Sequence, residues 1–219
     1  MDSWDDQLAH FKSIPWCAEL LSEPDLLIRP LISRTGSRKT RAFEFIGVTL
    51  NSEATVPFLL AFLHPPTSQA EAAEKNHDLP LEERNKLPLE ERFATKLYCL
   101  VTLGHGLTSF REGLCHGGAV ASLFDECNGA LGIVNKMFGL MEPKMHVTQS
   151  MNVTYLRPVP TQTTVLITST LTRVEGTRRF VVQGEMADEN GTVLVKSEVV
   201  YVILDKPMDA MRSVIKEKL

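Results

Sequence analysis

The sequence contains no apolar stretch of about 20 residues, the length that a helix needs to cross a bilayer. Its first residues, MDSWDDQLAHFKS, are acidic and show neither the apolar core of a signal peptide nor an Arg-rich transit pattern. Basic residues do not dominate either, because 23 Lys and Arg stand against 27 Asp and Glu, a formal net charge of −4. We therefore expect no membrane anchor, no nucleic-acid partner and a cytoplasmic location.

Cysteine is scarce, and no C-x-x-C pair is present. Without an export signal, the four cysteines are expected to be reduced thiols packed as small apolar groups. His105, Cys115 and His116 lack the spacing of zinc ligands, and the side chains of adjacent residues usually point in different directions, which argues against a Cys–His nucleophile. The glycines fit neither G-x-G-x-x-G nor a P-loop. We expect no metal and no cofactor.

The length of 219 residues and a hydrophobic share of 43% are sufficient for one domain with a substantial core. We expect an N-terminal extension over residues 1–40, a main domain over 41–205 and a C-terminal tail over 206–219. Within the domain, residues 64–95 include the near-duplicate LPLEERNKLPLEERF and read as a polar insertion.

Before the middle of the chain the pattern predicts short helices and then strands. The helices are interrupted at Pro15, and Pro57 indicates that its strand is at a sheet edge. We expect helices over 4–22, a loop over 23–40 with a basic cluster, and strands over 41–51, 55–63 and 96–104.

The second half predicts one buried helix followed by long strands. Residues 118–138 are apolar on nearly every face, which is typical of a buried helix. Gly176 and the Asn190-Gly191 pair mark tight turns between strands. The predicted strands are 146–156, 163–174, 178–188 and 192–204. This order, without parallel crossovers, predicts an α+β fold in which a curved antiparallel sheet wraps a long helix.

The stretch HGGAVASLFDE, residues 116–126, carries the chemistry. Its Gly-Gly pair stands where the helix is expected to begin, and the first N–H groups of a helix lack partners and carry partial positive charge. Such groups stabilise a carbonyl oxygen that becomes an oxyanion. Asp125 follows where a buried helix would ordinarily carry Leu or Ala. The combination indicates acyl chemistry.

This motif, followed by VTQSMNVTYLRP at residues 147–158, resembles the hotdog-fold thioesterases. The similarity is to the branch that shares an HGG…D signature, which includes phenylacetate-pathway thioesterases and human members of the acyl-CoA thioesterase superfamily. It covers roughly residues 96–204. The first 95 residues match loosely and are more similar to the longer eukaryotic members. The resemblance implies hydrolysis of acyl-thioesters of CoA or of an acyl carrier protein, in lipid or polyketide metabolism.

Carried over by position, the resemblance assigns the catalytic acid to Asp125 and the HGG to His116, Gly117 and Gly118. A hydroxyl that positions water in some members falls on Thr148. We interpret His116 as a residue that orders the loop rather than as a base.

Two positions depart from some relatives. Phe110 stands where they carry Gln, and Gly129 stands where they carry Ser or Thr. Both departures fit the branch that uses a strand threonine.

Further residues are candidates for substrate contact. Asn128 lies one helical turn after Asp125 and is expected to orient that carboxylate or to lie at the core edge. Asn152 lies within the second motif. Arg157, Arg178 and Arg179 are candidates for the phosphates of the nucleotide arm, with ordinary strand-end charge as the alternative. Glu126 is expected to point about 100° away from the face of Asp125 and to take no part.

Helix geometry also predicts a second subunit. Gly118 and Asp125 are seven residues apart, about 10 Å along a helix axis, whereas a reacting oxygen must lie about 3–3.5 Å from its carbonyl carbon. Asp125 should therefore act on a carbonyl held by the glycine turn of another subunit. We expect a two-fold homodimer with two composite sites, or a tetramer built from it.

Several alternatives remain open at this stage. Asp125 either activates water as a general base or attacks the thioester to form a mixed anhydride. A hotdog hydratase or dehydratase acting on thioester-linked acyl chains is one rival, and a non-catalytic protein that binds acyl-thioesters is another. The sequence does not specify the acyl chain or choose between CoA and carrier-protein substrates.

Overall fold

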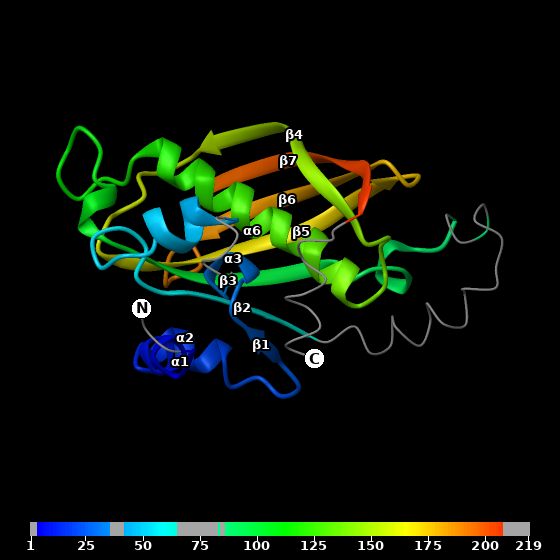
Figure 1. Cartoon of the computed structure of the whole chain (residues 1–219). Helices are drawn as coiled ribbons and strands as arrows, with labels where there is room; N and C mark the ends of the chain where they lie inside the picture. Colours follow the sequence, from blue (N-terminus) through cyan, green and yellow to red (C-terminus); the bar gives the residue numbers. More distant parts are fainter. Residues whose placement is uncertain (1–3, 36–41, 65–82, 84–85, 208–219) are drawn as a thin grey trace.

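One seven-stranded antiparallel sheet and one long helix, α6, form the centre of the molecule (Figure 1). The computed structural model describes residues 4–35, 42–64, 83 and 86–207. The strand order is β1-β2-β3-β5-β6-β7-β4, which places β1 and β4 at the two edges. The elements are α1 (Trp4–Lys12), α2 (Pro15–Leu20), β1 (Leu27–Arg29), α3 (Ile32–Thr35), the π-helix η1 (Phe45–Thr49), β2 (Leu59–Leu63), the 3₁₀ turn η2 (Leu89–Glu91), β3 (Lys96–Leu103), the 3₁₀ turn η3 (His105–Leu107), α6 (Gly117–Met137), β4 (Lys144–Tyr155), β5 (Thr163–Glu175), β6 (Arg179–Ala187) and β7 (Val193–Pro207).

The expected α+β hotdog architecture is confirmed. In Figure 1, α6 lies across one face of the curved sheet, and it contacts β3, β4, β5, β6 and β7. The predicted helix over 118–138 agrees with the observed one to within one residue. The four strands after it also form as predicted, and Gly176 and Gly191 take the positive φ values of 57° and 73° that their turns require.

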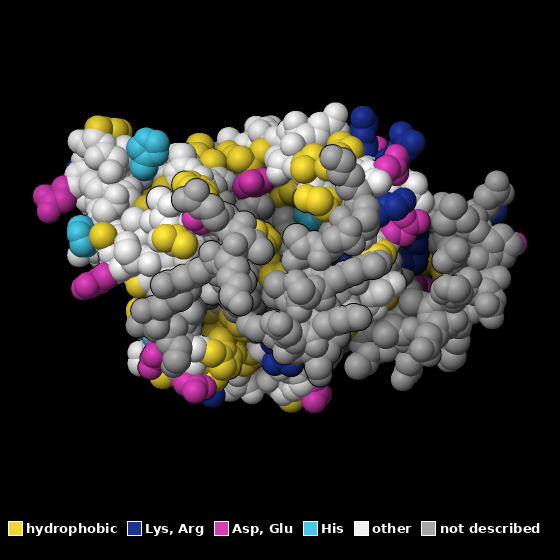
Figure 2. Space-filling model, viewed as in Figure 1, with side chains coloured by type: hydrophobic (Ala, Val, Ile, Leu, Met, Phe, Trp, Pro, Cys, Tyr) yellow, Lys and Arg dark blue, Asp and Glu magenta, His cyan; other side chains and the backbone are white. Residues whose placement is uncertain are grey.

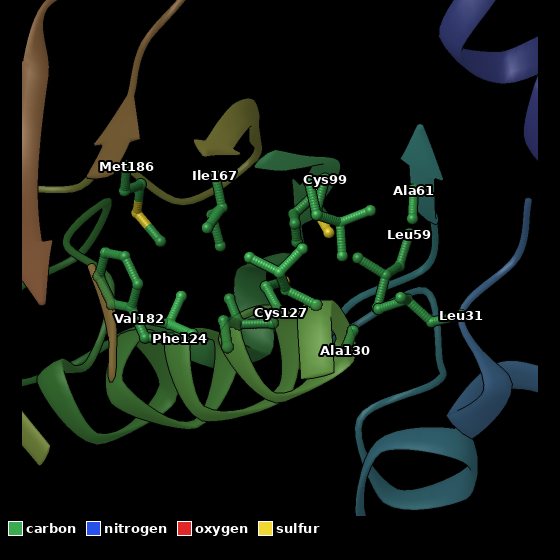
Figure 3. Packing of buried hydrophobic residues seen from close by; sticks show 14 of the residues in the cluster. Leu31, Leu59, Ala61, Cys99, Phe124, Cys127, Ala130, Ile167, Val182 and Met186 are labelled. Atoms are coloured by element: carbon green, nitrogen blue, oxygen red, sulfur yellow. The ribbon is translucent and has the colours of Figure 1, made fainter. Parts of the chain in front are cut away.

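The main core lies between α6 and the sheet. Leu123, Phe124, Cys127 and Leu131 recur at helical spacing on the face of α6 that is fully buried. Figure 3 shows Phe124, Cys127 and Ala130 on the helix beside the sheet residues that face them, among them Cys99, Ile167, Val182 and Met186. Burial of this face, rather than helix propensity, holds α6 in place, because the helix contains two interior glycines.

A second core lies on the opposite face of the sheet. Leu60 and Phe62 of β2 and Leu100 of β3 pack against Phe11 of α1 and Cys17 of α2. Their neighbours along the strands, such as Leu59 and Cys99, belong to the core under α6. Strands buried on both faces are apolar at every position, as the continuous run of β2 is. The short helices predicted over 4–22 are therefore the cover of this outer face, with the break at Pro15 as expected.

Three predictions before residue 64 were wrong. The segment 23–40, expected to be a loop, contains β1 and α3 within its described part. Pro57 does not mark an edge strand, because it precedes β2, and β2 pairs with both β1 and β3. The expected strand over 41–51 contains the π-helix η1 instead.

The π-helix η1 forms because of its apolar spacing and its contacts with α3. Ile46 and Leu50 are four residues apart and both are buried, which is a helical pattern rather than the alternation of a strand. Arg34 of α3 donates from Nη2 to the carbonyl of Leu50 at 3.0 Å and also hydrogen-bonds Asn51. These tertiary bonds close the end of the segment, so local alternation was a misleading signal.

Several predictions fall outside the described residues. These are most of the basic cluster from Arg34 to Arg41, most of the insertion over 64–95 and the tail from residue 208. Within the described part, the insertion ends in the 3₁₀ turn η2, and β7 continues through Pro207. None of the helices in the described part combines the length and the apolar character needed to cross a membrane.

The two interior glycines of α6 provide a test of the packing. A Cβ on Gly132 would lie 2.6 Å from Cζ of Phe180 and 3.2 Å from Cε1 of His146. A Cβ on Gly129 would lie no closer than 3.5 Å to Tyr201. We expect Gly132→Ala to lower the free energy of unfolding by about 1–3 kcal/mol, because Phe180 must move.

The matched control is Gly129→Ala, which has the same gain in helix propensity without the clash. It should leave the free energy of unfolding unchanged or raise it by up to about 1 kcal/mol. Urea unfolding followed by circular dichroism measures both variants. Equal stability of the two variants would contradict the proposed contact of Gly132 with Phe180.

Candidate active site

The start of α6 is organised by its own N-cap residue. His116 has extended backbone geometry, with φ −67° and ψ 130°, and its Nδ1 accepts a hydrogen bond from the N–H of Gly118 at 3.0 Å. The carbonyl of His116 accepts from the N–H groups of Ala119 and Val120. Because Nδ1 is an acceptor in this arrangement, the proton of the neutral ring lies on Nε2. His116 is therefore placed as a helix cap, in keeping with its predicted loop-ordering role.

Only one of the two predicted oxyanion donors is free in this arrangement. The N–H of Gly118 is occupied by His116, whereas the N–H of Gly117 has no hydrogen-bond partner among the described residues. Gly117 is the first residue of α6, where the N–H groups have no partner within the helix. The arrangement therefore favours Gly117 over Gly118 as the group that would bind a carbonyl oxygen.

A tyrosine that the sequence reasoning missed also contacts this turn. The hydroxyl of Tyr155, the last residue of β4, donates to the carbonyl of Gly117 at 2.6 Å. Its ring leaves little room for a side chain, since a Cβ on Gly117 would lie 3.2 Å from the hydroxyl. The only available signal was its position just before Leu-Arg-Pro in the second motif.

Asp125 lies two turns further along α6 and is exposed in the single chain, rather than buried as its apolar sequence context suggested. The hydroxyl of Thr148 on β4 donates to Oδ1 of Asp125 at 2.5 Å, the short distance expected of an O–H group bonded to a carboxylate. Tyr201, nearly fully buried on β7, donates to the backbone carbonyl of Asp125 at 3.1 Å. The structure thus brings Asp125 and Thr148 together.

The same helix keeps Asp125 and the glycine turn apart. α6 runs without a break from Gly117 to Met137, so eight residues separate Gly117 from Asp125, about 12 Å along the axis. The carboxylate of one chain cannot serve a carbonyl held at the N–H of its own Gly117.

Asn128 and Asn152 do not lie in this site. The side chain of Asn128 is fully buried, where Oδ1 accepts from Ser169 at 2.7 Å and Nδ2 donates to Ser197 at 3.0 Å. It joins α6 to the sheet and makes no bond to Asp125 within the described residues. Asn152 is exposed, and its strand neighbours Met151 and Val153 pack against the core. Because strand side chains alternate, Asn152 points away from α6.

Arg157 lies at one end of the sheet, and Arg178 and Arg179 lie at the other. Arg157 donates to the carbonyl of Val193 at 2.7 Å, at the start of β7 and close to the end of β4. The carbonyl of Arg178 accepts a hydrogen bond from the N–H of Ile203, near the end of β7. Arg179, the next residue, is the first residue of β6. Ten residues of strand separate the two positions, about 33 Å. Within one chain they cannot contact the same phosphate group.

A buried pair of titratable groups, also missed from the sequence, lies between α6 and β4. Nζ of Lys136 hydrogen-bonds Nδ1 of His146, whose ring packs edge-on against Phe180 and Tyr201. Burial, and then the nearby charge of Lys136, lower the pKa of His146 to about 3. Burial lowers the pKa of Lys136 to about 8. The neutral imidazole can therefore accept from the ammonium group.

This pair predicts a pH dependence of stability. Between pH 6.5 and about 3 the unfolded chain binds a proton at His146 that the folded chain excludes, so the free energy of unfolding falls as the pH falls. For Lys136 the same argument makes stability rise between about pH 8 and 10.5. Between pH 6.5 and 5, the free energy of unfolding should change less steeply with pH in His146→Gln than in the wild type. The expected difference in slope is up to about 1.4 kcal/mol per pH unit. Urea unfolding at several pH values measures it.

The matched control is His105→Gln, because the side chain of His105 is exposed and makes no hydrogen bond or ion pair among the described residues. This variant should keep the slope of the wild type. If the His146 variant and the wild type had parallel profiles, the exclusion of the proton from His146 would be wrong.

Within the described residues no group of three or more His, Cys, Asp or Glu side chains is placed to hold a metal ion. The four cysteines are buried and unbridged, and burial raises the pKa of the Cys115 thiol to about 11. Glu126 lies under α3, where burial raises the pKa of its carboxyl group and the charge of Arg34 opposes the shift.

Comparison with known proteins confirms the resemblance seen in the sequence. The family model of the thioesterase superfamily matches residues 112–195, from the loop before α6 into β7. The mouse protein named acyl-coenzyme A thioesterase THEM4 is 28% identical over 98 residues, which is 44% of this chain and 39% of that protein. This chain thus matches less than half of the length of that curated relative.

Partial similarity to solved structures is also found. One thioesterase superfamily protein is 27% identical, with a TM-score of 0.42 and coverage of 49% of this chain and 51% of that one. A hypothetical thioesterase from Streptococcus pneumoniae with coenzyme A is 16% identical, with a TM-score of 0.45 and coverage of 52% and 81%.

Proposed function

We propose that this chain hydrolyses acyl-thioesters, in the first place acyl-CoA, to a free acid and a thiol. The proposal rests on two groups of the same helix. One is the exposed carboxylate of Asp125, which Thr148 hydrogen-bonds, and the other is the N–H of Gly117, which has no partner among the described residues. These are the two groups that acyl transfer needs, a carboxylate base or nucleophile and a donor for the carbonyl oxygen. The name of the curated mouse relative supports CoA as the thiol.

The residues act on a thioester in a simple sequence. The N–H of Gly117 polarises the carbonyl. Asp125 then takes a proton from a water molecule whose oxygen attacks the carbonyl carbon, or attacks directly to form a mixed anhydride that water cleaves. In both routes the C–S bond breaks and the thiolate takes up a proton. Thr148 bonds to Oδ1 of Asp125 and thereby leaves Oδ2 for the reaction.

We further propose that each site is shared by two copies of the chain, paired along β4. This strand is an edge of the sheet, so one row of its backbone groups is available for another strand. Met145, Val147 and Leu156, on or next to this edge, are 43–47% exposed, and Figure 2 shows hydrophobic side chains at the surface there. An exposed, partly apolar edge of twelve residues favours a partner strand.

The positions of two residues on β4 indicate the register. Thr148 touches Asp125, and Tyr155 touches Gly117. They are seven residues apart, and the bulge between Thr148 and Ser150 lets both face α6. If two β4 strands pair antiparallel about a twofold axis near Met151, Thr148 of each copy comes opposite Tyr155 of the other. Asp125 of one copy would then approach Gly117 of the partner.

Among the three arginines, Arg157 is the proposed contact for a phosphate or for the pantetheine arm. It lies two residues after Tyr155, at the end of β4 that holds the glycine turn. Arg178 and Arg179 are at the other end of the sheet, so they would reach the same substrate only from the partner.

Replacement of the carboxylate tests the central proposal. Asp125→Asn keeps the shape and the hydrogen bond from Thr148 but removes the base, so kcat for release of thiol from acyl-CoA should fall by about 100-fold or more. Colorimetric detection of free thiol over a panel of acyl-CoA esters measures it.

The matched control is Asp205→Asn, the same change at an exposed carboxylate 3.8 Å from Lys144, and it should retain wild-type turnover. Undiminished thiol release by the Asp125 variant would rule out the assigned role. Consumption of an enoyl substrate without thiol release would indicate a hydratase, and binding without turnover would indicate a binding protein.

A mixing experiment tests the shared site. Gly117→Pro removes the N–H, and proline suits the first helical position and follows the extended His116 well. Neither this variant nor Asp125→Asn should be active alone. After the two are refolded together at equal amounts, half of the dimers contain one intact site, so about a quarter of wild-type activity should return.

Gly117→Ala is the control for the added carbon atoms, because alanine retains the N–H group. It should keep more activity than the proline variant, although its Cβ would lie 3.2 Å from the hydroxyl of Tyr155. Mixtures that remain inactive, while each variant still forms dimers, would show that the site does not span two chains.

A further inference from the structure

Tyr155 is connected to the first residue of α6 more directly than any other described side chain of β4. Its hydroxyl donates to the carbonyl of Gly117 at 2.6 Å, and a Cβ added to Gly117 would lie 3.2 Å from that hydroxyl and 3.3 Å from the ring carbon Cζ. The side chain is nevertheless 50% exposed, so its ring is not held by the core. The contact with Gly117 is therefore its principal interaction.

The protonation state of Tyr155 suits a permanent donor. Partial burial, with a smaller contribution from Cys115, raises the pKa of the Tyr155 hydroxyl above its ordinary value. The group thus keeps its proton throughout the neutral range and can donate to a carbonyl but cannot act as a base there.

Two side chains together determine the geometry of the glycine turn. His116 holds the N–H of Gly118 from within the loop, and Tyr155 holds the carbonyl of Gly117 from the edge strand. Each ring also leaves little room for a side chain, since a Cβ on Gly118 would lie 3.1 Å from the ring of His116. With these two groups bonded, the N–H of Gly117 is the one that has no hydrogen-bond partner among the described residues.

We propose that Tyr155 is a positioning residue that orients the Gly117 peptide for binding of the thioester carbonyl oxygen. This inference rests on the proposed function for its catalytic consequence, although not for the contact itself. Because Thr148 lies on the same strand, β4 positions both reacting groups: Thr148 holds the carboxylate, and Tyr155 holds the turn that carries the amide. Pairing of β4 with a second copy would align the two across the interface.

Tyr155→Phe tests the proposal, since it removes the hydroxyl and keeps the ring. We expect kcat for acyl-CoA to fall about tenfold while KM changes less than about threefold, because a misaligned donor affects the transition state more than the bound substrate. The pH profile of kcat should keep its shape. Tyr98→Phe on β3, where Tyr98 stacks on Phe62, is the matched control and should retain wild-type kinetics.

A second measurement does not depend on activity. In ¹⁵N-labelled protein, the amide of Gly118, which is hydrogen-bonded to His116, should exchange with solvent about tenfold faster in Tyr155→Phe than in the wild type, and at an unchanged rate in Tyr98→Phe. Equal exchange rates and equal kcat in wild type and Tyr155→Phe would overturn the inference.

The two proposals fail in distinguishable ways. If the wild type releases no thiol from any acyl-CoA ester, the proposed function fails, and the exchange rates alone decide the role of Tyr155. If the wild type is active and Tyr155→Phe retains full kcat, the positioning role fails while the hydrolase proposal stands.

Discussion

A single continuous helix sets the distance between the two groups on which the proposed chemistry depends. α6 starts at the capped glycine turn and carries Asp125 two turns later, and its buried face packs against β3, β4, β5, β6 and β7. Gly117 and Asp125 of one chain are therefore about 12 Å apart along the helix axis. Because of this separation, the motif of one helix favours a site shared by two chains.

The edge strand β4 then determines what surrounds both groups. It supplies Thr148 to the carboxylate, Tyr155 to the glycine turn and, through His146, a buried contact to the C-terminal half of α6. A bulge near Thr148 is what allows these residues to face the helix in spite of their odd spacing. The strand at the opposite edge, β1, comes from the N-terminal segment, and α1 and α2 cover the outer face beside it. Among the described strands, β4 is the long edge that remains.

Sequence reasoning was most successful where the signal is local. The glycine pair, the carboxylate in an apolar helix and the long alternating strands are patterns of neighbouring residues, and the structure has the helix and the strands where they were expected. It was wrong for residues 41–51, because Arg34 closes that segment as a π-helix through contacts that no local pattern contains. For Asn128 the sequence left open a role beside Asp125 or a position at the core edge, and the buried amide bonds Ser169 and Ser197 on two strands of the sheet.

By itself, the sequence determined the type of fold and the chemical character of the site, since hydrophobic periodicity, glycine turns and a helix cap depend on residues close together in the chain. The tertiary structure decided which amide is free, which hydroxyl holds the carboxylate and which arginine lies near the turn. Those outcomes depend on strand register and on a bulge, and a shift of one residue would turn each of these side chains to the other face of the sheet. Tyr155 illustrates the difference: its sequence context shows an aromatic residue before Leu-Arg-Pro, and only the pairing of β4 with β7 brings its hydroxyl to Gly117.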